Sequence, residues 1–305
     1  MDANQLFKAF NNINIAIIGD VIIDRYLNGN VDRISPEAPV PIIHLKREDN
    51  RLGGSGNVAL NIKAMGATPF LFSVIGDDEN GEIFKKLMPE NNLWQNGILR
   101  SKERCTTVKT RVMANNQQLL RVDREDTIDL SKSEEDNFIN KIKTFLAGQN
   151  IDVIILQDYN KGVLSLPVIS KILSLAEKNE IPIVVDPKKV NFLAYKNVEI
   201  FKPNLKEIQE STPFQVLPNL DSLKKASEFL RKKTKFPDGV VGVFHRRWGL
   251  RGGSEPKSAI LPGTLPGHLE VPGPSYPHVH AQGTFHWHWA PLGTTHGLVT
   301  GLKRG

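Results

Sequence analysis

Two carboxylates follow the apolar run Asn14–Gly19 near the beginning of the sequence. Asp20 and Asp24 lie where a buried strand would end, and a carboxylate pair at such a place can accept hydrogen bonds from the hydroxyl groups of a sugar. Aspartate is equally common in turns and at the ends of helices and strands. The pair alone therefore leaves both interpretations open.

A glycine-rich segment, Gly53-Gly54-Ser55-Gly56-Asn57, precedes a stretch with helical spacing. Backbone N–H groups in the first turn of a helix can hold an anion or a hydroxyl group, and glycines permit close approach of such a ligand. Ordinary turns use the same residues, so the segment is a weak signal when it is read alone.

A lysine and a short amide-carboxylate motif complete the set of polar segments. Lys161, within Asp158-Tyr-Asn-Lys-Gly162, follows an apolar strand and could neutralise a phosphate; a solvated surface lysine is the alternative. Asn204-Leu205-Lys206-Glu207 places an amide and a carboxylate at a strand-to-helix junction, where hard oxygen ligands suit Mg²⁺ or its water shell. An N-cap Asn with Glu in the first turn would explain the same residues.

Short apolar runs alternate with helix-like stretches over most of the chain. This alternation is typical of a mostly parallel sheet with helices on both faces, whose ligands bind at the carboxyl ends of the strands. Ser131-Lys-Ser-Glu134 is a capping box that begins a helix ended by Gly148. The remaining predicted strands are Asn14–Gly19, Thr68–Ile75, Asp152–Leu156, Pro182–Val185, Glu199–Lys202 and one around Gly239–Val243, and the remaining predicted helices cover Asn57–Met65, a segment from Gly81, Leu166–Asn179, Leu205–Gln209 and Ser222–Lys232.

Two segments, Tyr26–Leu45 and Cys105–Val122, lack helical periodicity and are typical of antiparallel ribbons. We expect lid strands over about residues 26–45 and 105–122, inserted into the α/β core so that they cover a site at the sheet edge. Lid strands expose edges and an apolar face. A homodimer that pairs lid to lid is the expected way to cover them.

The composition is that of a globular chain, with 40% hydrophobic and 24% charged residues. No apolar run approaches the roughly 20 residues that span a bilayer, and the first residues carry neither the basic nor the apolar region of a secretory signal. Cys105 is the only cysteine, which excludes a disulfide framework and predicts a cytoplasmic location.

The last part of the sequence differs from the rest. Residues 239–305 hold 13 of the 24 glycines and seven of the eight histidines, and such a density of Gly and Pro is typical of chains without a regular core. This tail also carries six basic residues against two acidic ones, so the net charge of +6 predicts neither a nucleic-acid nor a membrane partner. We expect one α/β domain over residues 1–236 and an irregular tail over 237–305.

Taken together, the polar segments resemble motifs of the ribokinase-like, or PfkB, family of sugar kinases, from about residue 12 to about residue 236. The string Arg33-Ile-Ser-Pro-Glu-Ala-Pro-Val-Pro41 is the most specific one, and it is similar to the lid of the bacterial heptose-7-phosphate kinases. Supporting strings are Gly19-Asp-Val-Ile-Ile-Asp-Arg-Tyr26, Ile75-Gly-Asp-Asp-Glu-Asn-Gly81, Asn116-Gln-Gln-Leu-Leu-Arg121 and Asp158–Gly162.

The resemblance implies a three-layer α/β fold with a small β lid, and transfer of phosphate from ATP, with Mg²⁺, to D-glycero-β-D-manno-heptose 7-phosphate. It implies that the substrate is bound by Asp20, Asp24, Gly53, Gly54, Asn57, Asp158 and Lys161, with Lys161 near the substrate phosphate. It also implies that Asn204, Leu205, Lys206 and Glu207 bind ATP, with Asn204 and Glu207 facing the metal ion.

One feature of the family is missing from this sequence. Members carry a Gly-Ala-Gly-Asp motif after the last core strands, whose Asp is the catalytic base and whose N–H groups form an anion hole. Residues 237–305 contain no match, and no Asp follows Asp238, so the catalytic base is unassigned. We therefore expect kinase turnover to be absent or strongly reduced. A shift in the reading frame of the coding sequence would explain the difference.

Three alternatives stay open at this level. The first is a related kinase for fructose or ribose, against which the Arg33–Pro41 string argues. The second is a sugar-binding protein without catalysis, which would keep the sugar residues and lose the base. The third is the non-functional product of a frameshifted gene.

Overall fold

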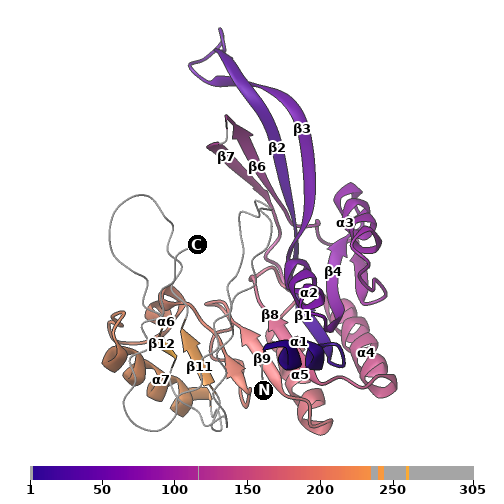
Figure 1. Cartoon of the computed structure of the whole chain (residues 1–305), viewed down its shortest axis with the longest axis vertical. Coiled ribbons are helices and arrows are strands. Elements are labelled where there is room, and N and C mark those ends of the chain that lie inside the picture. Colours follow the sequence, from indigo (N-terminus) through magenta and orange to yellow (C-terminus); the bar gives the residue numbers. More distant parts are fainter. Residues whose placement is uncertain (1–2, 116, 235–239, 244–258, 261–305) are drawn as a thin grey trace.

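The computed structural model describes residues 3–115, 117–234, 240–243 and 259–260, and within them the strands form two sheets (Figure 1). The central sheet has the strand order β12-β11-β10-β9-β8-β1-β4-β5. The smaller sheet, called the lid, has the order β3-β2-β6-β7 and projects away from the central sheet. The predicted α/β core with an inserted β lid is confirmed.

Neighbouring strands of the central sheet are parallel, apart from the antiparallel pair of β11 and β12. Parallel neighbours bring all their carboxyl ends to one edge of the sheet. The strands are β1 Asn14–Gly19, β4 Thr68–Gly76, β5 Ile98–Ser101, β8 Val153–Gln157, β9 Ile183–Asp186, β10 Ile200–Phe201, β11 Val240–Val243 and β12 Ala259–Ile260.

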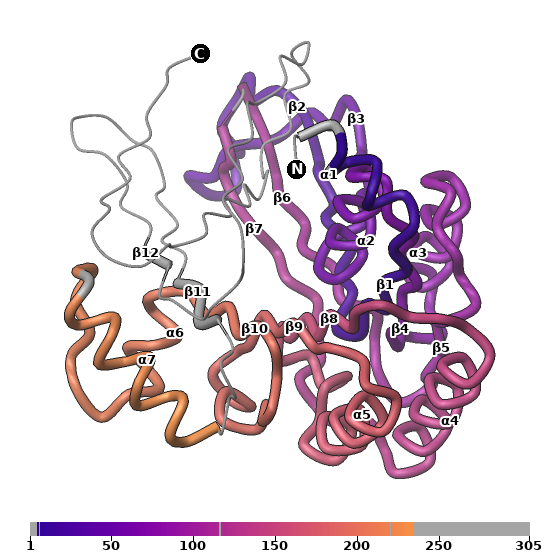
Figure 2. The backbone as a smooth tube through the Cα atoms, turned by 60° about the horizontal axis from the view of Figure 1, so that its bottom comes forward, coloured from indigo at the N-terminus to yellow at the C-terminus, as the bar shows by residue number. Residues whose placement is uncertain are grey.

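Helices cover both faces of this sheet (Figure 2). In β1, Ala16 and Ile18 belong to the hydrophobic core shared with α4 and α5, whereas Ile15 and Ile17 belong to the core shared with α2 and α3. A strand buried on both faces needs such a continuous apolar run. The helices are α1 Ala3–Phe10, α2 Ser55–Ala64, α3 Glu79–Glu90, α4 Lys132–Gly148, α5 Leu166–Lys178, α6 Leu205–Ser211 and α7 Leu220–Thr234.

Local sequence explains where several helices begin. Ser131 and Glu134 form the predicted capping box of α4, and the helix ends at Gly148 as expected. The hydroxyl of Ser165 caps α5, and the carboxylate of Asp78 accepts a hydrogen bond from the Gly81 N–H in the first turn of α3. The sequence analysis did not predict α1 or β5, which are short elements.

The first lid ribbon is longer than the predicted segment Tyr26–Leu45, whereas the second lies close to the predicted segment Cys105–Val122. β2 is Val21–Ile34 and β3 is Pro41–Gly54, and they pair as an antiparallel ribbon. β6 Val108–Ala114 and β7 Gln117–Arg124 form the second antiparallel ribbon, while β2 and β6 join the two ribbons in parallel. Because β2 begins two residues after β1 ends, the lid extends directly from the carboxyl edge of the central sheet.

The central sheet continues beyond the predicted domain boundary at residue 236. The strand expected around Gly239–Val243 is β11, which pairs in parallel with β10, and β12 adds a final antiparallel pair. The remainder of the predicted tail, 237–305, lies outside the described residues. Among the described residues, no helix combines the length and the apolar character needed to span a bilayer.

Candidate functional site

Charged side chains meet at the carboxyl edge of the central sheet. Asp20 follows β1, Asp158 follows β8, Asp186 ends β9 and Lys202 follows β10. The sequence prediction that Asp20 and Asp158 share one edge is therefore confirmed by strand pairing. Ligands of parallel α/β sheets bind at this edge.

Asp20 connects the end of β1 to the loop 158–163. Its Oδ2 accepts hydrogen bonds from the backbone N–H groups of Tyr159 and Lys161, at 2.8 and 3.1 Å, and its Oδ1 accepts one from Val163 at 3.1 Å. The residue is 1% exposed. Its carboxylate thus fixes the loop that carries Lys161.

The backbone of Asp20 also fixes the beginning of α2. Its carbonyl oxygen accepts hydrogen bonds from the Ser55 N–H at 2.9 Å and the Ser55 hydroxyl at 2.8 Å. One residue therefore holds the glycine-rich segment and the loop 158–163 at neighbouring positions. Burial raises the pKa of Asp20 to about 6, and the nearby charge of Asp158 acts in the same direction, while the three backbone N–H groups lower it.

Asp158 forms a second buried support for the same loop. Its carboxylate accepts hydrogen bonds from the Tyr195 hydroxyl and from the Asn160 N–H, each at 2.7 Å. Burial raises the pKa of Asp158, and both burial and the charge of Asp158 raise the pKa of Tyr195. Asn160 has a φ of +54°, a left-handed conformation that asparagine tolerates better than most residues.

Asp24 lies on β2 at the base of the lid and is half-buried. Its Oδ1 accepts a hydrogen bond from Nη1 of Arg111, on β6, at 2.6 Å. A Cβ at Gly53 would lie 2.4 Å from the other carboxylate oxygen of Asp24, so a larger residue at this position would displace that carboxylate. Asn57 is half-buried in the first turn of α2. The glycine-rich segment thus borders Asp24, as a binding site for hydroxyl groups requires.

Lys161 forms an ion pair instead of extending into solvent. Its ammonium group lies 2.8 Å from a carboxylate oxygen of Glu125, and the two side chains are 13% and 29% exposed. A small cavity of about 10 Å³, the size of one water molecule, lies between Asp20, Arg104 and Lys161 and is completed by Val21, Val74, Ile75, Cys105, Thr107 and Val163. The loop lysine and the base of β6 are therefore neighbours.

Asn204 and Glu207 close a capping box at the beginning of α6. The Asn204 side chain accepts a hydrogen bond from the Glu207 N–H at 2.9 Å, and Glu207 Oε2 accepts one from the Asn204 N–H at 2.7 Å. Glu207 Oε1 pairs with Lys188. Leu205 and Lys206 follow in the first turn of α6. The segment therefore forms a complete helix N-cap at the sheet edge.

These contacts bear on whether Asn204 and Glu207 can hold Mg²⁺. Their oxygens are engaged within the protein, yet a carboxylate keeps free lone pairs for a water molecule, and Mg²⁺ retains several of its waters in proteins. The pair therefore fits a hydrated ion. Among the described residues, no group of three His, Cys, Asp or Glu side chains is arranged to hold a metal ion.

The sequence analysis missed three charged residues at this edge. Asp186 accepts a hydrogen bond from Gln157 at 3.1 Å and pairs with Lys202 at 2.9 Å, and Lys188 pairs with Glu207. The prediction ended the strand at Val185, one residue before Asp186. Ligands bind after the ends of parallel strands. A strand predicted to end at Asp186 would therefore have identified Asp186-Pro-Lys188 as candidate site residues.

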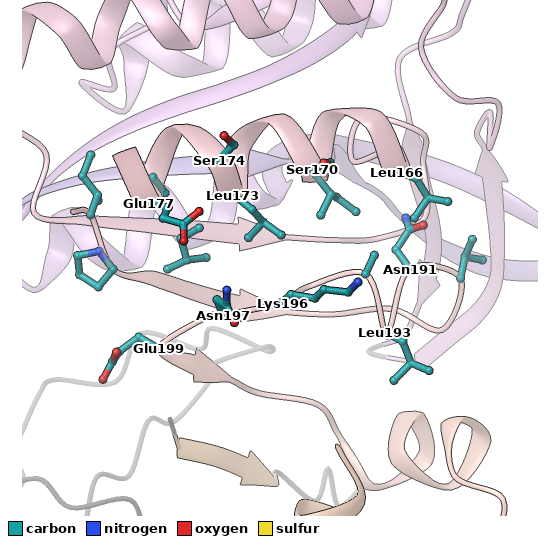
Figure 3. A pocket seen from close by; sticks show the side chains of 17 residues that line it. Leu166, Ser170, Leu173, Ser174, Glu177, Asn191, Leu193, Lys196, Asn197 and Glu199 are labelled. Carbon is teal, nitrogen blue, oxygen red and sulfur yellow. The ribbon is translucent and has the colours of Figure 1, made fainter. Parts of the chain in front are cut away.

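A larger cavity lies away from these residues. It has a volume of about 800 Å³ and lies between α5 and the segment 190–199 (Figure 3). Leu173, Glu177 and Lys196 are among its lining side chains. None of the predicted site residues contributes to it, so the cavity is separate from the sheet-edge site.

The family of this chain follows from its match to known protein families. The profile of the pfkB family carbohydrate kinases matches residues 12–241, which include every predicted site residue. The chain belongs to this family. Its members are sugar phosphotransferases, so the residues at the sheet edge belong to a sugar kinase fold.

Curated relatives agree with this membership. The chain is 37% identical over 229 residues to the bifunctional protein HldE of Geobacter sulfurreducens, a match that covers 75% of this chain and 46% of the relative. It is 41% identical over 222 residues to HldE of Helicobacter pylori strain Shi470, covering 72% and 46%. The chain spans about half the length of these relatives.

Solved structures agree on the fold. Phosphofructokinase-2 from Escherichia coli in complex with fructose-6-phosphate superposes with a TM-score of 0.61 at 20% identity, covering 76% of this chain and 73% of that one. Arabidopsis thaliana ribokinase complexed with ribose and ATP gives a TM-score of 0.53 at 13% identity, covering 76% and 71%. The predicted ribokinase-like fold is confirmed.

Proposed function

We propose that this chain is built to phosphorylate D-glycero-β-D-manno-heptose 7-phosphate to the 1,7-bisphosphate with ATP. The observation that supports this most is the Asp24 carboxylate at the base of the lid, beside the glycine-rich start of α2 and one strand away from Lys109 on β6. Such a site offers acceptors for hydroxyl groups and cations for a phosphate. The likeness of Arg33–Pro41 to heptose kinases favours this sugar.

On the sugar side, Asp24 accepts hydrogen bonds from hydroxyl groups, and Gly53, Gly54 and Asn57 line the site beside it. Lys161 lies near the phosphate that the sugar already carries. Asp20 and Asp158 act through the loop 158–163, because their carboxylates hold its backbone in place. They therefore contribute to substrate binding by positioning this loop and not by contacting the sugar.

On the nucleotide side, the segment Asn204–Glu207 and Lys188 face the phosphates of ATP. Mg²⁺, when bound, offsets negative charge on the transferred phosphoryl group. Glu207 holds Lys188 in place through their ion pair and can accept a hydrogen bond from a water of the hydrated ion. Lys188, already held in place by Glu207, then supplies a positive charge for the ATP phosphates without rearrangement of the backbone.

Titration of the purified chain tests this assignment. Isothermal titration with heptose 7-phosphate should give saturable binding that is at least tenfold tighter than binding of fructose 6-phosphate or ribose. Asp24→Ala should abolish sugar binding, because it removes the acceptor of the hydroxyl groups. Preference for fructose 6-phosphate or ribose would overturn the assignment. Saturable binding of heptose 7-phosphate supports the assignment whether or not ADP forms, because residues 237–305 contain no match to the Gly-Ala-Gly-Asp motif on which turnover in the family depends.

We also propose that the protein forms a homodimer through the lid. Leu120 and Val122 on the edge strand β7 are 57% and 52% exposed, and Leu45 on β3 is 49% exposed. An exposed edge with apolar side chains favours pairing with a second copy. Sedimentation should report a dimer, and Leu120→Lys should shift it to a monomer. A monomeric wild-type protein would refute the proposal.

A further inference from the structure

A row of charged side chains crosses the four strands of the lid. Arg51 on β3 is the register partner of Asp24 on β2, Asp24 is the partner of Lys109 on β6, and Lys109 is the partner of Asp123 on β7. Side chains at paired positions lie on the same face of a sheet, at the spacing of neighbouring strands. Lys109 thus lies next to the residue that we assign to the sugar hydroxyl groups.

The acidic members of this row already have partners. Asp24 pairs with Arg111 at 2.6 Å, and Asp123 pairs with Nε of Arg121 at 2.9 Å. By contrast, Lys109 makes no ion pair within 4 Å to any of the residues that the structure describes. Lys109 is therefore a cation in the row without a fixed counter-ion.

The surroundings of Lys109 favour an added anion. The side chain is half-buried, and burial lowers the pKa of Lys109. The charges of Lys161 and Arg121 lower it further, against the opposing effect of Asp123 and Glu125. An incoming anion would relieve this repulsion between cations, so its binding and the charged state of Lys109 favour each other.

We propose that Lys109 and Lys161 together receive the phosphate group that the sugar substrate already carries, and that Lys109 selects phosphorylated over unphosphorylated sugars. The inference rests on the proposed function, since it takes Asp24 to hold the sugar. Two ammonium groups match the charge of a phosphate dianion. Lys161 exchanges its partner Glu125 for the phosphate, whereas Lys109 gives up no ion pair.

A pair of ligands isolates the role of Lys109. In isothermal titrations of the full chain, Lys109→Met should weaken binding of heptose 7-phosphate by about 10- to 100-fold, the usual effect of losing a charge-assisted hydrogen bond. Binding of the unphosphorylated heptose should stay unchanged, and Lys109→Arg should restore most of the affinity. Lys46→Met, on the exposed surface of β3 in the same lid, is the control and should have no effect.

The wild-type protein provides an independent readout. Heptose 7-phosphate should protect Lys109 and Lys161 from acylation, measured by peptide mass spectrometry, while unphosphorylated heptose and buffer should not. This measurement remains decisive if Lys109→Met unfolds, which its melting temperature without ligand would reveal.

The outcomes separate the two proposals. If the wild type binds heptose 7-phosphate and Lys109 stays equally reactive, or if Lys109→Met loses affinity for both sugars alike, the role of Lys109 is refuted while the proposed function stands. If the wild type binds neither sugar, the proposed function itself fails.

Discussion

Asp20 is a buried carboxylate whose charge state affects the stability of the whole site. Its pKa is about 6 in the folded protein and 3.8 ordinarily, so folding takes up a proton between about pH 4 and pH 6. The free energy of unfolding should therefore rise as the pH falls through this window, by up to about 3 kcal/mol for two pKa units. At neutral pH Asp20 is mainly ionised, and the free energy of unfolding is lower there than at pH 4 because burial disfavours the charged carboxylate.

Asp20→Asn should remove this dependence. The amide also places N–H donors against the backbone N–H groups of the loop 158–163, so the variant should be less stable than the wild type by about 1–3 kcal/mol at pH 7.5 and by more at pH 4.5. Urea unfolding of both proteins at pH 4.5 and pH 7.5 checks the prediction. The stability difference between wild type and variant should be larger at pH 4.5. A difference that stays constant with pH would contradict the assignment.

The hydroxyl of Tyr195 stabilises the neighbouring carboxylate. Tyr195 is fully buried and donates a hydrogen bond to Asp158 at 2.7 Å. Tyr195→Phe leaves that buried carboxylate with one donor fewer and should lower the free energy of unfolding by about 1–3 kcal/mol, measured in urea at pH 7.5. Tyr26→Phe is the control: its ring, stacked with Arg51 and Arg111, is kept. Equal losses in both variants would refute the assignment.

The identity of the site residues could be predicted from the sequence more readily than the side chains with which they pair. Asp24 and Lys161 were identified from their positions after apolar runs. Their partners Arg111 and Glu125 depend on the register of β6 and on how the loop from β7 approaches the sheet. Such pairings join distant parts of the chain, and local patterns do not encode them.

Among the elements, the start of α2 depends on the backbone freedom of Gly54. Its φ is +59°, and a Cβ would lie 2.5 Å from the Asp20 carbonyl oxygen. Gly54→Ala should lower the free energy of unfolding by more than 1 kcal/mol, and it should weaken sugar binding because Asn57 would shift.

Gly148→Ala is the matched control for this substitution. Gly148 is the last residue of α4, and a Cβ there meets no atom within 4 Å. The substitution should leave stability unchanged or raise it by up to about 1 kcal/mol, since alanine favours helix. Chemical denaturation of the two variants side by side tests the pair. Similar losses in both would show that the left-handed conformation of Gly54 does not matter.

Helix starts and the second lid ribbon, Cys105–Val122, were predicted well, whereas the length of the first lid ribbon was not. The capping box at Ser131 is a local signal and identifies α4 directly. The strands β2 and β3 extend well beyond Tyr26–Leu45 because their pairing, with its irregularities at Gly29 and Arg33, continues to Gly54. Charged and polar residues such as Arg47 and Asp49 hide that continuation, since the lid is largely exposed and its strands lack a buried face.

For the whole molecule, alternation of strands and helices was enough to predict an α/β core, because each strand needs helices on both faces to bury its apolar side chains. The order of the strands does not follow from that pattern, as β1 lies between β4 and β8. The match to the family ends at residue 241, close to the predicted change in composition near residue 237.

The remaining prediction concerns catalysis by the whole chain. No Asp follows Asp238, so the Gly-Ala-Gly-Asp motif that the family resemblance implies has no counterpart in residues 237–305. A general base typically contributes 10²–10⁴-fold to the rate and one oxyanion-type donor about 10²–10³-fold. We do not expect Asn204 and Glu207 to substitute, because the proposed arrangement places them beside the nucleotide and not beside the sugar hydroxyl proton.

We therefore expect the pure chain to bind heptose 7-phosphate and to release ADP at a rate lower by several orders of magnitude than a complete kinase of this family. A coupled ADP assay, with single-turnover conditions to separate binding from chemistry, checks this. Recovery of activity after a one-base correction of the coding sequence near codons 237–244 would support a frameshift as the cause. Rapid heptose-dependent ADP formation by the uncorrected chain would mean that another residue removes the hydroxyl proton.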